Sequence, residues 1–146
     1  MNEKQREQLL KPINESRIAQ RKGGGGRMLS YLEAWDVRAH MIRIFGFAEW
    51  SWVVTQAELV YEDERDGKWD VAYKVLGSLQ VDGAIYAEAA VGSSRLPQRG
   101  EAHDMAVKTA ESDAFKRAAV NLGDQFGLSL YSNGSLRPVV TTTLKG

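Results

Sequence analysis

The sequence predicts an α+β fold in which a three-stranded antiparallel β-meander is flanked by helices. Residues 49–61 alternate with a period of two and are rich in β-forming side chains. Two Asp-Gly pairs, beginning at Asp66 and Asp82, follow at the spacing of hairpin turns. Apolar residues between 104 and 127 recur at the helical period. We expect the helices to pack on one face of the sheet.

The first predicted element is a short polar helix over residues 3–11, which Pro12 ends. Leu9, Leu10 and Ile13 are expected to form its buried side.

Four consecutive glycines, residues 23–26, come next. Such a run is either a flexible linker or a backbone segment that passes close to another surface. It lacks the Gly-Lys-Ser/Thr ending of a nucleotide-binding P-loop, which excludes that kind of ATP site. The basic residues around the run are Arg17, Arg21, Lys22 and Arg27.

A second helix is predicted to start at about Tyr31, because Ser30 and Glu33 have the spacing of a capping box. It continues to a stop at Gly46. Tyr31 and Trp35 lie four residues apart, so we expect them in the core. Stacking on a nucleobase is the alternative for both aromatic rings.

The meander follows this helix. A loop over residues 92–100, carrying Arg95 and Arg99, is expected after its last strand. The three strands are predicted over residues 49–61, 69–79 and 84–91.

The longest predicted helix spans residues 104–127. Gly127 is its expected end, and Gly123 marks an earlier kink as the alternative. After Tyr131 the sequence is polar and weakly patterned, which indicates a mobile tail or a docking arm over residues 131–146. The apolar stripe of the helix consists of Val107, Ala110, Ala114, Phe115, Ala118, Ala119, Leu122 and Phe126.

Charged residues on the long helix are spaced for ion pairs. Asp104 stands four residues before Lys108, and Asp113 four before Arg117, which is the favourable orientation. Lys116 lies beside Arg117, so two bases can straddle one helix edge and face a polyanion. The alternative is a solvated face held by ordinary helical ion pairs.

The composition limits the function. At 146 residues the chain is expected to form one domain, and it has no cysteine, so it has no disulfide framework or thiolate metal site. The two histidines, His40 and His103, form no zinc motif, and we expect His40 at the surface or partly buried. No run is apolar enough for a membrane span or signal peptide. We therefore expect an intracellular protein with no metal or cofactor.

The 19 basic and 19 acidic residues cancel, but they are unevenly distributed. Residues 1–43 hold nine bases and five acids, whereas residues 58–70 hold six acids and two bases. This layout suits either local DNA binding or head-to-tail subunit contacts. The carboxylates of Glu62, Asp63, Glu64 and Asp66 are dense enough for a nuclease magnesium site, although a solvated hairpin tip is the expected interpretation.

Three blocks, in the same order, resemble the Rad52/Rad22 family of single-strand annealing proteins. They are SRIAQRKGGGGRMLSYLEAW, IFGFAEW and DAFKRAAVNLGDQFG. The first resembles the family's Ser-Arg, glycine-run and Tyr-apolar-Glu segment, the second its Phe-Gly-aromatic stretch, and the third its Lys-Arg-Ala helix. Together they cover most of residues 16–130.

The resemblance implies an annealing domain over residues 1–130 that assembles into a homo-oligomeric ring. Its implied activity is ATP-independent binding of single-stranded DNA and annealing of complementary strands in recombination and double-strand break repair. It implies no enzymatic chemistry. A recombinase or a single-strand binding protein is the expected further partner, in the cytoplasm or nucleoid of a bacterial or phage-infected host.

The resemblance also implies DNA-binding residues. Lys116 and Arg117 match the family's Lys-Arg pair, which lines the inner single-strand site, and Phe47 matches the aromatic residue after Phe-Gly. Asp36 and Val120 occupy positions that the family fills with bases. The cations available as substitutes are Arg27, Arg38, Arg43 and Lys108, and candidates for an outer site, by location only, are Lys74, Arg95 and Arg99.

A different class of function competes with annealing. The zero net charge and the two departures, Asp36 and Val120, are compatible with a structural oligomeric adaptor that scaffolds a recombinase or replication protein. On that hypothesis DNA contact is incidental. The nuclease hypothesis ranks third.

Overall fold

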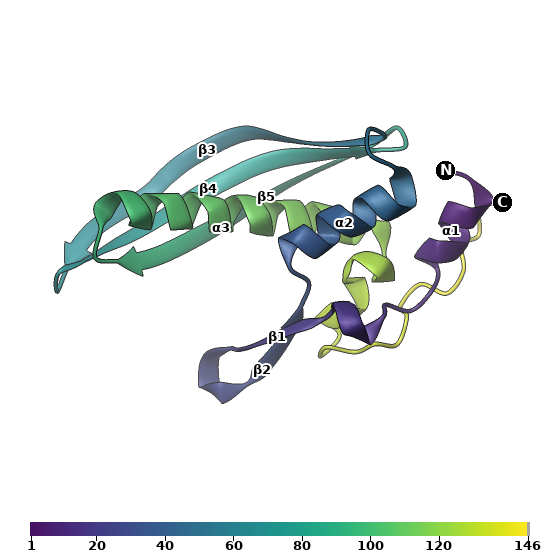
Figure 1. Cartoon of the computed structure of the whole chain (residues 1–146), viewed down its shortest axis with the longest axis horizontal. Helices are drawn as coiled ribbons and strands as arrows, with labels where there is room; N and C mark the ends of the chain where they lie inside the picture. Colours follow the sequence, from purple (N-terminus) through teal and green to yellow (C-terminus); the bar gives the residue numbers. More distant parts are fainter. Residues whose placement is uncertain (146) are drawn as a thin grey trace. The chain divides into compact units, whose positions relative to one another are not determined.

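The computed structural model describes residues 1–145 and has the predicted α+β architecture (Figure 1). The chain divides into two compact units. The sheet unit is Ser51–Ala118, and the helical unit is Met1–Trp50 together with the chain from Ala119 onward. None of the helices in the described part of the chain is long and apolar enough to cross a membrane.

The sheet unit contains the predicted three-stranded meander, with β4 in the middle of the order β3-β4-β5. Asp66 and Gly67 have φ of 52° and 74°, and Asp82 and Gly83 have φ of 50° and 81°. Positive φ at both central residues is the signature of the type I′ turn, whose twist matches that of a hairpin. The strands are β3 (Trp50–Arg65), β4 (Lys68–Val81) and β5 (Ala84–Leu96).

Strand β5 is longer than expected and the next helix begins at Arg99, so the predicted loop over residues 92–100 shrinks to Pro97 and Gln98. The antiparallel register with β4 runs from Val81↔Ala84 at the turn to Trp69↔Leu96. The sequence pattern fails here because the strand continues through small and polar residues, Gly92-Ser-Ser, which have weak β propensity. Pairing with the whole length of β4 overrides that local preference.

Helix α3 (Arg99–Ala119) runs along one face of the sheet (Figure 1). Its small residues let it approach closely: a Cβ added to Gly92 of β5 would lie 2.7 Å from the Ala106 carbonyl oxygen. Glycine at 92 therefore sets the distance between helix and strand. The buried partners are Val71 with Ala102 and Ala106, and Val75 with Ala110 and Ala114.

The long helix begins five residues earlier and ends eight residues earlier than predicted. After Ala119 the chain tightens into successive 3-10 turns. Gly123 and Gly127, which separate these turns, have φ of 95° and 98°. A positive φ of this size ends a helix rather than kinking it. The 3-10 turns are Val120–Leu122, Asp124–Phe126 and Leu128–Tyr131.

The helical unit contains a β-hairpin that the sequence did not predict. The glycine run forms its tip, with Gly25 and Gly26 at φ of 75° and 74°, so the run is a turn within a hairpin and not a linker between elements. Its flexibility stays a prediction. Each strand is only four residues long, which is too short for a recognisable alternation. The hairpin pairs β1 (Ala19–Lys22) with β2 (Met28–Tyr31), and the helices of this unit are α1 (Glu3–Leu9) and α2 (Ala34–Phe45).

Helix α2 starts at Ala34, three residues later than predicted, because Ser30 pairs with Gln20 in the hairpin and cannot cap it. Trp35 is 65% exposed, so its predicted place in the core is wrong. Its indole Nε1 donates to Glu33 Oε2 at 2.7 Å, which satisfies the ring at the surface. His40 was expected at or near the surface and is instead buried.

The chain after the last 3-10 turn contacts a fully buried carboxylate. Asp124 Oδ2 accepts hydrogen bonds from the backbone N–H groups of Val139 and Val140, both at 3.0 Å. The domain boundary at residue 130 and the mobility of the tail stay predictions.

Candidate nucleic-acid interface

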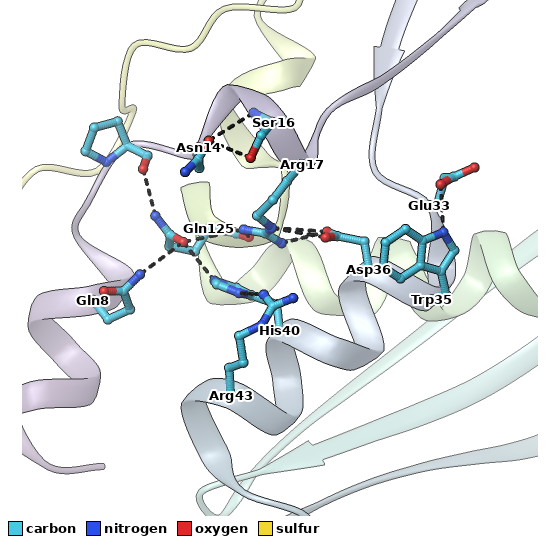
Figure 2. A network of polar contacts seen from close by, with 11 residues as sticks. Gln8, Asn14, Ser16, Arg17, Glu33, Trp35, Asp36, His40, Arg43 and Gln125 are labelled. Carbon is cyan, nitrogen blue, oxygen red and sulfur yellow. Dashed lines mark hydrogen bonds and ion pairs between the residues drawn. The ribbon is translucent and has the colours of Figure 1, made fainter.

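A buried ion pair lies at the centre of the helical unit (Figure 2). Arg17 Nη2 lies 2.8 Å from Asp36 Oδ2, and the two side chains are only 10% and 5% exposed. Arg17 Nη1 also donates to the backbone carbonyl of Gln125 at 2.8 Å. The guanidinium thus fixes the 3-10 turn that holds Gln125 against the start of α2. Sequence reasoning named Arg17 only as one base near the glycine run.

The Gln125 side chain joins three segments (Figure 2). Its Nε2 donates to the carbonyls of Lys11 and Pro12 at 2.9 and 2.8 Å, and its Oε1 accepts from His40 Nε2 at 2.8 Å. No sequence signal identifies this residue, because these three partners lie 85 to 114 residues away along the chain.

His40 is held in its neutral form. Arg43 Nη1 lies 2.6 Å from His40 Nδ1, and a guanidinium can only donate, so Nδ1 accepts and Nε2 carries the proton. Burial, followed by the charge of Arg17, lowers the pKa of His40 from 6.5 to about 4. At neutral pH His40 therefore adds no positive charge to this unit.

This arrangement explains the acidic residue at position 36. Asp36 is buried and its carboxylate receives both Nε and Nη2 of Arg17, so it is part of the interior of the unit. A base there would face Arg17 and repel it. Asp36 therefore does not mark a surface position from which a phosphate contact is missing. Val120, the second departure, lies partly buried in a 3-10 turn.

The Lys-Arg pair near the end of α3 is loosely paired. Lys116 Nζ lies 3.6 Å from Asp113, and Arg117 Nε lies 3.6 Å from Glu88 of β5. The predicted Asp113–Arg117 pair is wrong, because Arg117 reaches across to the sheet instead. The predicted Asp104–Lys108 pair is confirmed at 2.9 Å.

All three outer-site candidates pair with carboxylates of the β3–β4 hairpin. Arg99 Nη2 lies 2.9 Å from Glu62 and its guanidinium lies over the Trp69 ring at 5.0 Å. Hydrogen bonds from Arg99 and then from His103 lower the pKa of Glu62 below 4.5. Arg95 lies 3.6 Å from both Asp66 and Asp70, and Lys74 lies 3.8 Å from Glu58.

This acidic hairpin does not form a metal centre in the described part of the chain, where no group of three or more metal-ligating side chains is found. Glu62 already binds two basic partners, Arg99 and His103. The acidic run is thus used for ion pairs within the sheet unit.

The remaining candidates lie in the helical unit. Phe47, just after α2, is 89% exposed, so its ring is not used by the core. Arg27 Nη2 donates to Asn133 Oδ1 at 3.3 Å, and Arg38 lies partly buried on α2. The structure thus places Arg27, Arg38, Arg43 and Phe47 in one unit and Lys74, Arg95, Arg99, Lys108, Lys116 and Arg117 in the other.

The meander followed by a helix that carries Lys116 and Arg117 has the order expected from the sequence resemblance. The family pattern described as Rad52/22 family double-strand break repair protein matches residues 2–143. The chain belongs to this family. Membership of the Rad52/22 family covers both units, since the match begins before α1 and ends after the last 3-10 turn.

Relatives in the Rad52/22 family include three yeast proteins, each named a DNA repair and recombination protein. Two from Schizosaccharomyces pombe, rti1 and rad22, and one from Saccharomyces cerevisiae, RAD52, are each 28% identical over 135 residues. In each case the match covers 90% of this chain but only 36%, 29% and 28% of the relative. The chain therefore spans about a third of the length of these relatives. A phage or bacterial origin stays a prediction.

Proposed function

We propose that this chain binds single-stranded DNA and anneals complementary strands without ATP, in homologous recombination and double-strand break repair. Family membership and the names of the relatives support the general process. The observation that carries the specific activity is the adjacent pair Lys116 and Arg117, which stands at the end of α3 in the segment that resembles the family helix.

The ion pairs of these two residues are weak enough to be exchanged for phosphate. Arg117 and Glu88 are 55% and 30% exposed and 3.6 Å apart. Exposed pairs of this kind contribute about 0.2–1 kcal/mol, whereas a hydrogen bond to a charged group contributes about 1.5–3 kcal/mol. A DNA phosphate therefore replaces the carboxylate without a large cost. Phosphate contacts leave the base edges exposed for a second strand.

The exposed ring of Phe47 suits such an interface, because stacking on an aromatic side chain is tolerant of base identity. Arg27, Arg38 and Arg43 are the cations that the helical unit offers. We propose Arg95, Arg99, Lys74 and Lys108 as secondary contacts. Like Lys116 and Arg117, each is paired with a carboxylate that it must exchange for phosphate, but none belongs to the Lys-Arg pair of the family helix.

We propose further that the chain works as a homo-oligomeric ring with a recombinase or single-strand binding protein as partner, inside the cell. Head-to-tail contacts between unlike surfaces close into rings when the rotation allows it. Light scattering at micromolar concentration, with and without DNA, measures the assembly. A monomer under both conditions contradicts the ring.

The decisive experiment uses the double variant Lys116→Ala with Arg117→Ala. We expect it to lose annealing of complementary oligonucleotides, assayed without nucleotide or metal, while the mass of the assembly is unchanged. The slope of log affinity against log salt should fall by about one unit for each phosphate contact that the substitutions remove. The matched control removes two exposed cations of the helical unit, Arg6→Ala with Lys11→Ala, and should anneal like the parent.

Normal annealing by the double variant would make Lys116 and Arg117 surface charges without a role in DNA binding. Dissociation into monomers would place them at a subunit contact. Either result removes this site assignment.

An oligomeric adaptor is the second candidate function. The observation that favours it is the pairing of the sheet-unit candidates Lys74, Arg95, Arg99, Lys108, Lys116 and Arg117 with carboxylates, which agrees with the zero net charge. An adaptor should bind single strands weakly and with little dependence on salt. A steep salt dependence with little preference for base order favours annealing.

A further inference from the structure

A polar pocket of about 430 Å³ lies between α1 and α2 in the helical unit. This volume is in the range of small-ligand sites. Three of its residues, Gln8, His40 and Arg43, belong to the polar network in Figure 2. The full lining is Asn2, Lys4, Gln5, Gln8, His40, Arg43 and Ile44.

The pocket carries two positive charges and no carboxylate. Lys4 and Arg43 are the charged residues of its lining. The acidic residues of α1, Glu3 and Glu7, are not among the residues that line the pocket. The two cations are therefore not neutralised within the pocket.

Arg43 differs from Arg17, the other arginine of the polar network, because its hydrogen-bond partner is neutral. Its Nη1 donates to His40 Nδ1, and this bond orients the guanidinium without cancelling its charge. His40 is in turn held by Gln125 Oε1. The side chain is exposed, and a guanidinium has five N–H donors, so donors remain for a ligand. The Arg43 guanidinium is therefore oriented by a neutral partner, and its positive charge is available to an anionic ligand.

The uncharged residues of the lining have their own partners and act as rigid walls. Asn2 and Gln5 form a reciprocal capping box at the start of α1. Gln5 Nε2 also donates to the carbonyl of Ile44 at 2.9 Å, which ties α1 to the end of α2. The site is thus organised before any ligand arrives, which lowers the entropic cost of binding.

We propose that this pocket binds a phosphate monoester through Arg43 and Lys4. A monoester carries a charge of about −1.5 to −2 at neutral pH, which matches two cations, and its oxygens fit the planar fork of a guanidinium. A phosphodiester within a strand carries only one charge, so it matches the two cations less well. Arg43 is shared with the annealing contacts proposed above, whereas Lys4 belongs to this pocket alone. The ligand is either a free mononucleotide or the terminal phosphate of a DNA strand.

The test titrates the full chain with thymidine monophosphate and with thymidine by calorimetry. We expect saturable binding of the monophosphate and none of the nucleoside. Arg43→Gln and Lys4→Gln should each weaken binding by about tenfold or more. The matched control is Arg6→Gln, a cation on the same helix that is absent from the lining, and it should bind like the parent.

A second pair of titrations separates the two sources of the ligand. A short oligothymidylate with a 5′-phosphate is compared with the same strand with a 5′-hydroxyl, in the parent and in Lys4→Gln. A gain in affinity that needs both the 5′-phosphate and Lys4 identifies strand ends as the source. Binding of the monophosphate with no such gain identifies the free nucleotide.

The proposal is overturned if thymidine binds as well as its monophosphate, or if neither binds in the millimolar range. It is also overturned if Lys4→Gln binds the monophosphate like the parent. Lys4 has no described role in the fold, so that result is readable even if Arg43→Gln, which loses its bond to His40, does not fold. Mononucleotide binding is independent of annealing, so loss of annealing in the Lys116 and Arg117 variant leaves it intact.

Discussion

Arg17 and Arg117 show how differently the two units use the same side chain. In the helical unit Arg17 is enclosed, with a carboxylate at 2.8 Å and a backbone carbonyl at 2.8 Å. In the sheet unit Arg117 lies on the surface with its carboxylate at 3.6 Å. The first arrangement buries the guanidinium against its partners and ties the fold together. The second costs little to break, so it leaves the charge available to a polyanion.

The largest expected effect is on stability, from Arg17→Ala. Removing one partner of a buried pair leaves Asp36 as an uncompensated charge, which costs about 3–5 kcal/mol. Urea unfolding measures this loss. Removing both partners, Arg17→Ala with Asp36→Ala, should cost less than the single change. If the single variant lost under about 1 kcal/mol, the pair would not differ from a surface pair.

The second effect is the pH dependence that His40 gives to the helical unit. The unfolded chain takes up a proton at pKa 6.5, whereas the folded chain does so only at about 4. Stability from this group is therefore present above pH 6.5 and is lost as the pH falls from 6.5 to about 4, by about 3 kcal/mol in total. Urea unfolding at a series of pH values measures it.

The matched control is His40→Gln, which keeps an N–H for Gln125 Oε1 but does not titrate. The difference between parent and variant isolates His40 from the carboxylates that protonate in the same range. A constant difference from pH 6.5 to 4 would show that the folded state accepts the proton freely, and the enclosed character of this network would be disproved.

The smallest effect on stability is expected from Arg117→Ala. An exposed pair contributes at most about 1 kcal/mol, so the free energy of unfolding should change by no more than that. Affinity for single-stranded DNA should nevertheless fall, and the salt slope should decrease by about one unit. A large loss of stability would make Arg117 a structural residue like Arg17, and the contrast between the units would disappear.

The sheet unit was largely predictable because its signals are local. Asp66-Gly67 and Asp82-Gly83 adopt the turn that their chemistry favours, and the small residues of α3 face the sheet as their spacing indicates. Lys116 and Arg117 stand on that helix as expected. The error over Arg117's partner arose because Glu88 is distant in sequence, while Asp113 is at the helical interval.

The helical unit was predicted less well because its contacts are not local. Ser30 has the spacing of a helix cap, yet pairing with Gln20 in the hairpin takes precedence. Trp35 has a core-like spacing but lies at the surface. His40 is buried, and its Nε2–H donates a hydrogen bond to Gln125, which lies 85 residues later in the chain. Arg43 at the proposed pocket is oriented by His40, which is itself held by Gln125. Because Gln125 is distant in sequence, no local motif could reveal this network.

The division of the chain also orders its folding. The sheet unit is one continuous segment, and its closing pair Val81↔Ala84 is adjacent to a turn, so it forms through short loops. The helical unit is discontinuous, and its bond from Arg17 to Gln125 closes a loop of 108 residues. During synthesis, residues 1–50 leave the ribosome before the sheet unit, but their contacts with Gln125 can form only after the sheet unit has been made. We therefore expect the sheet unit to fold before the helical unit is complete.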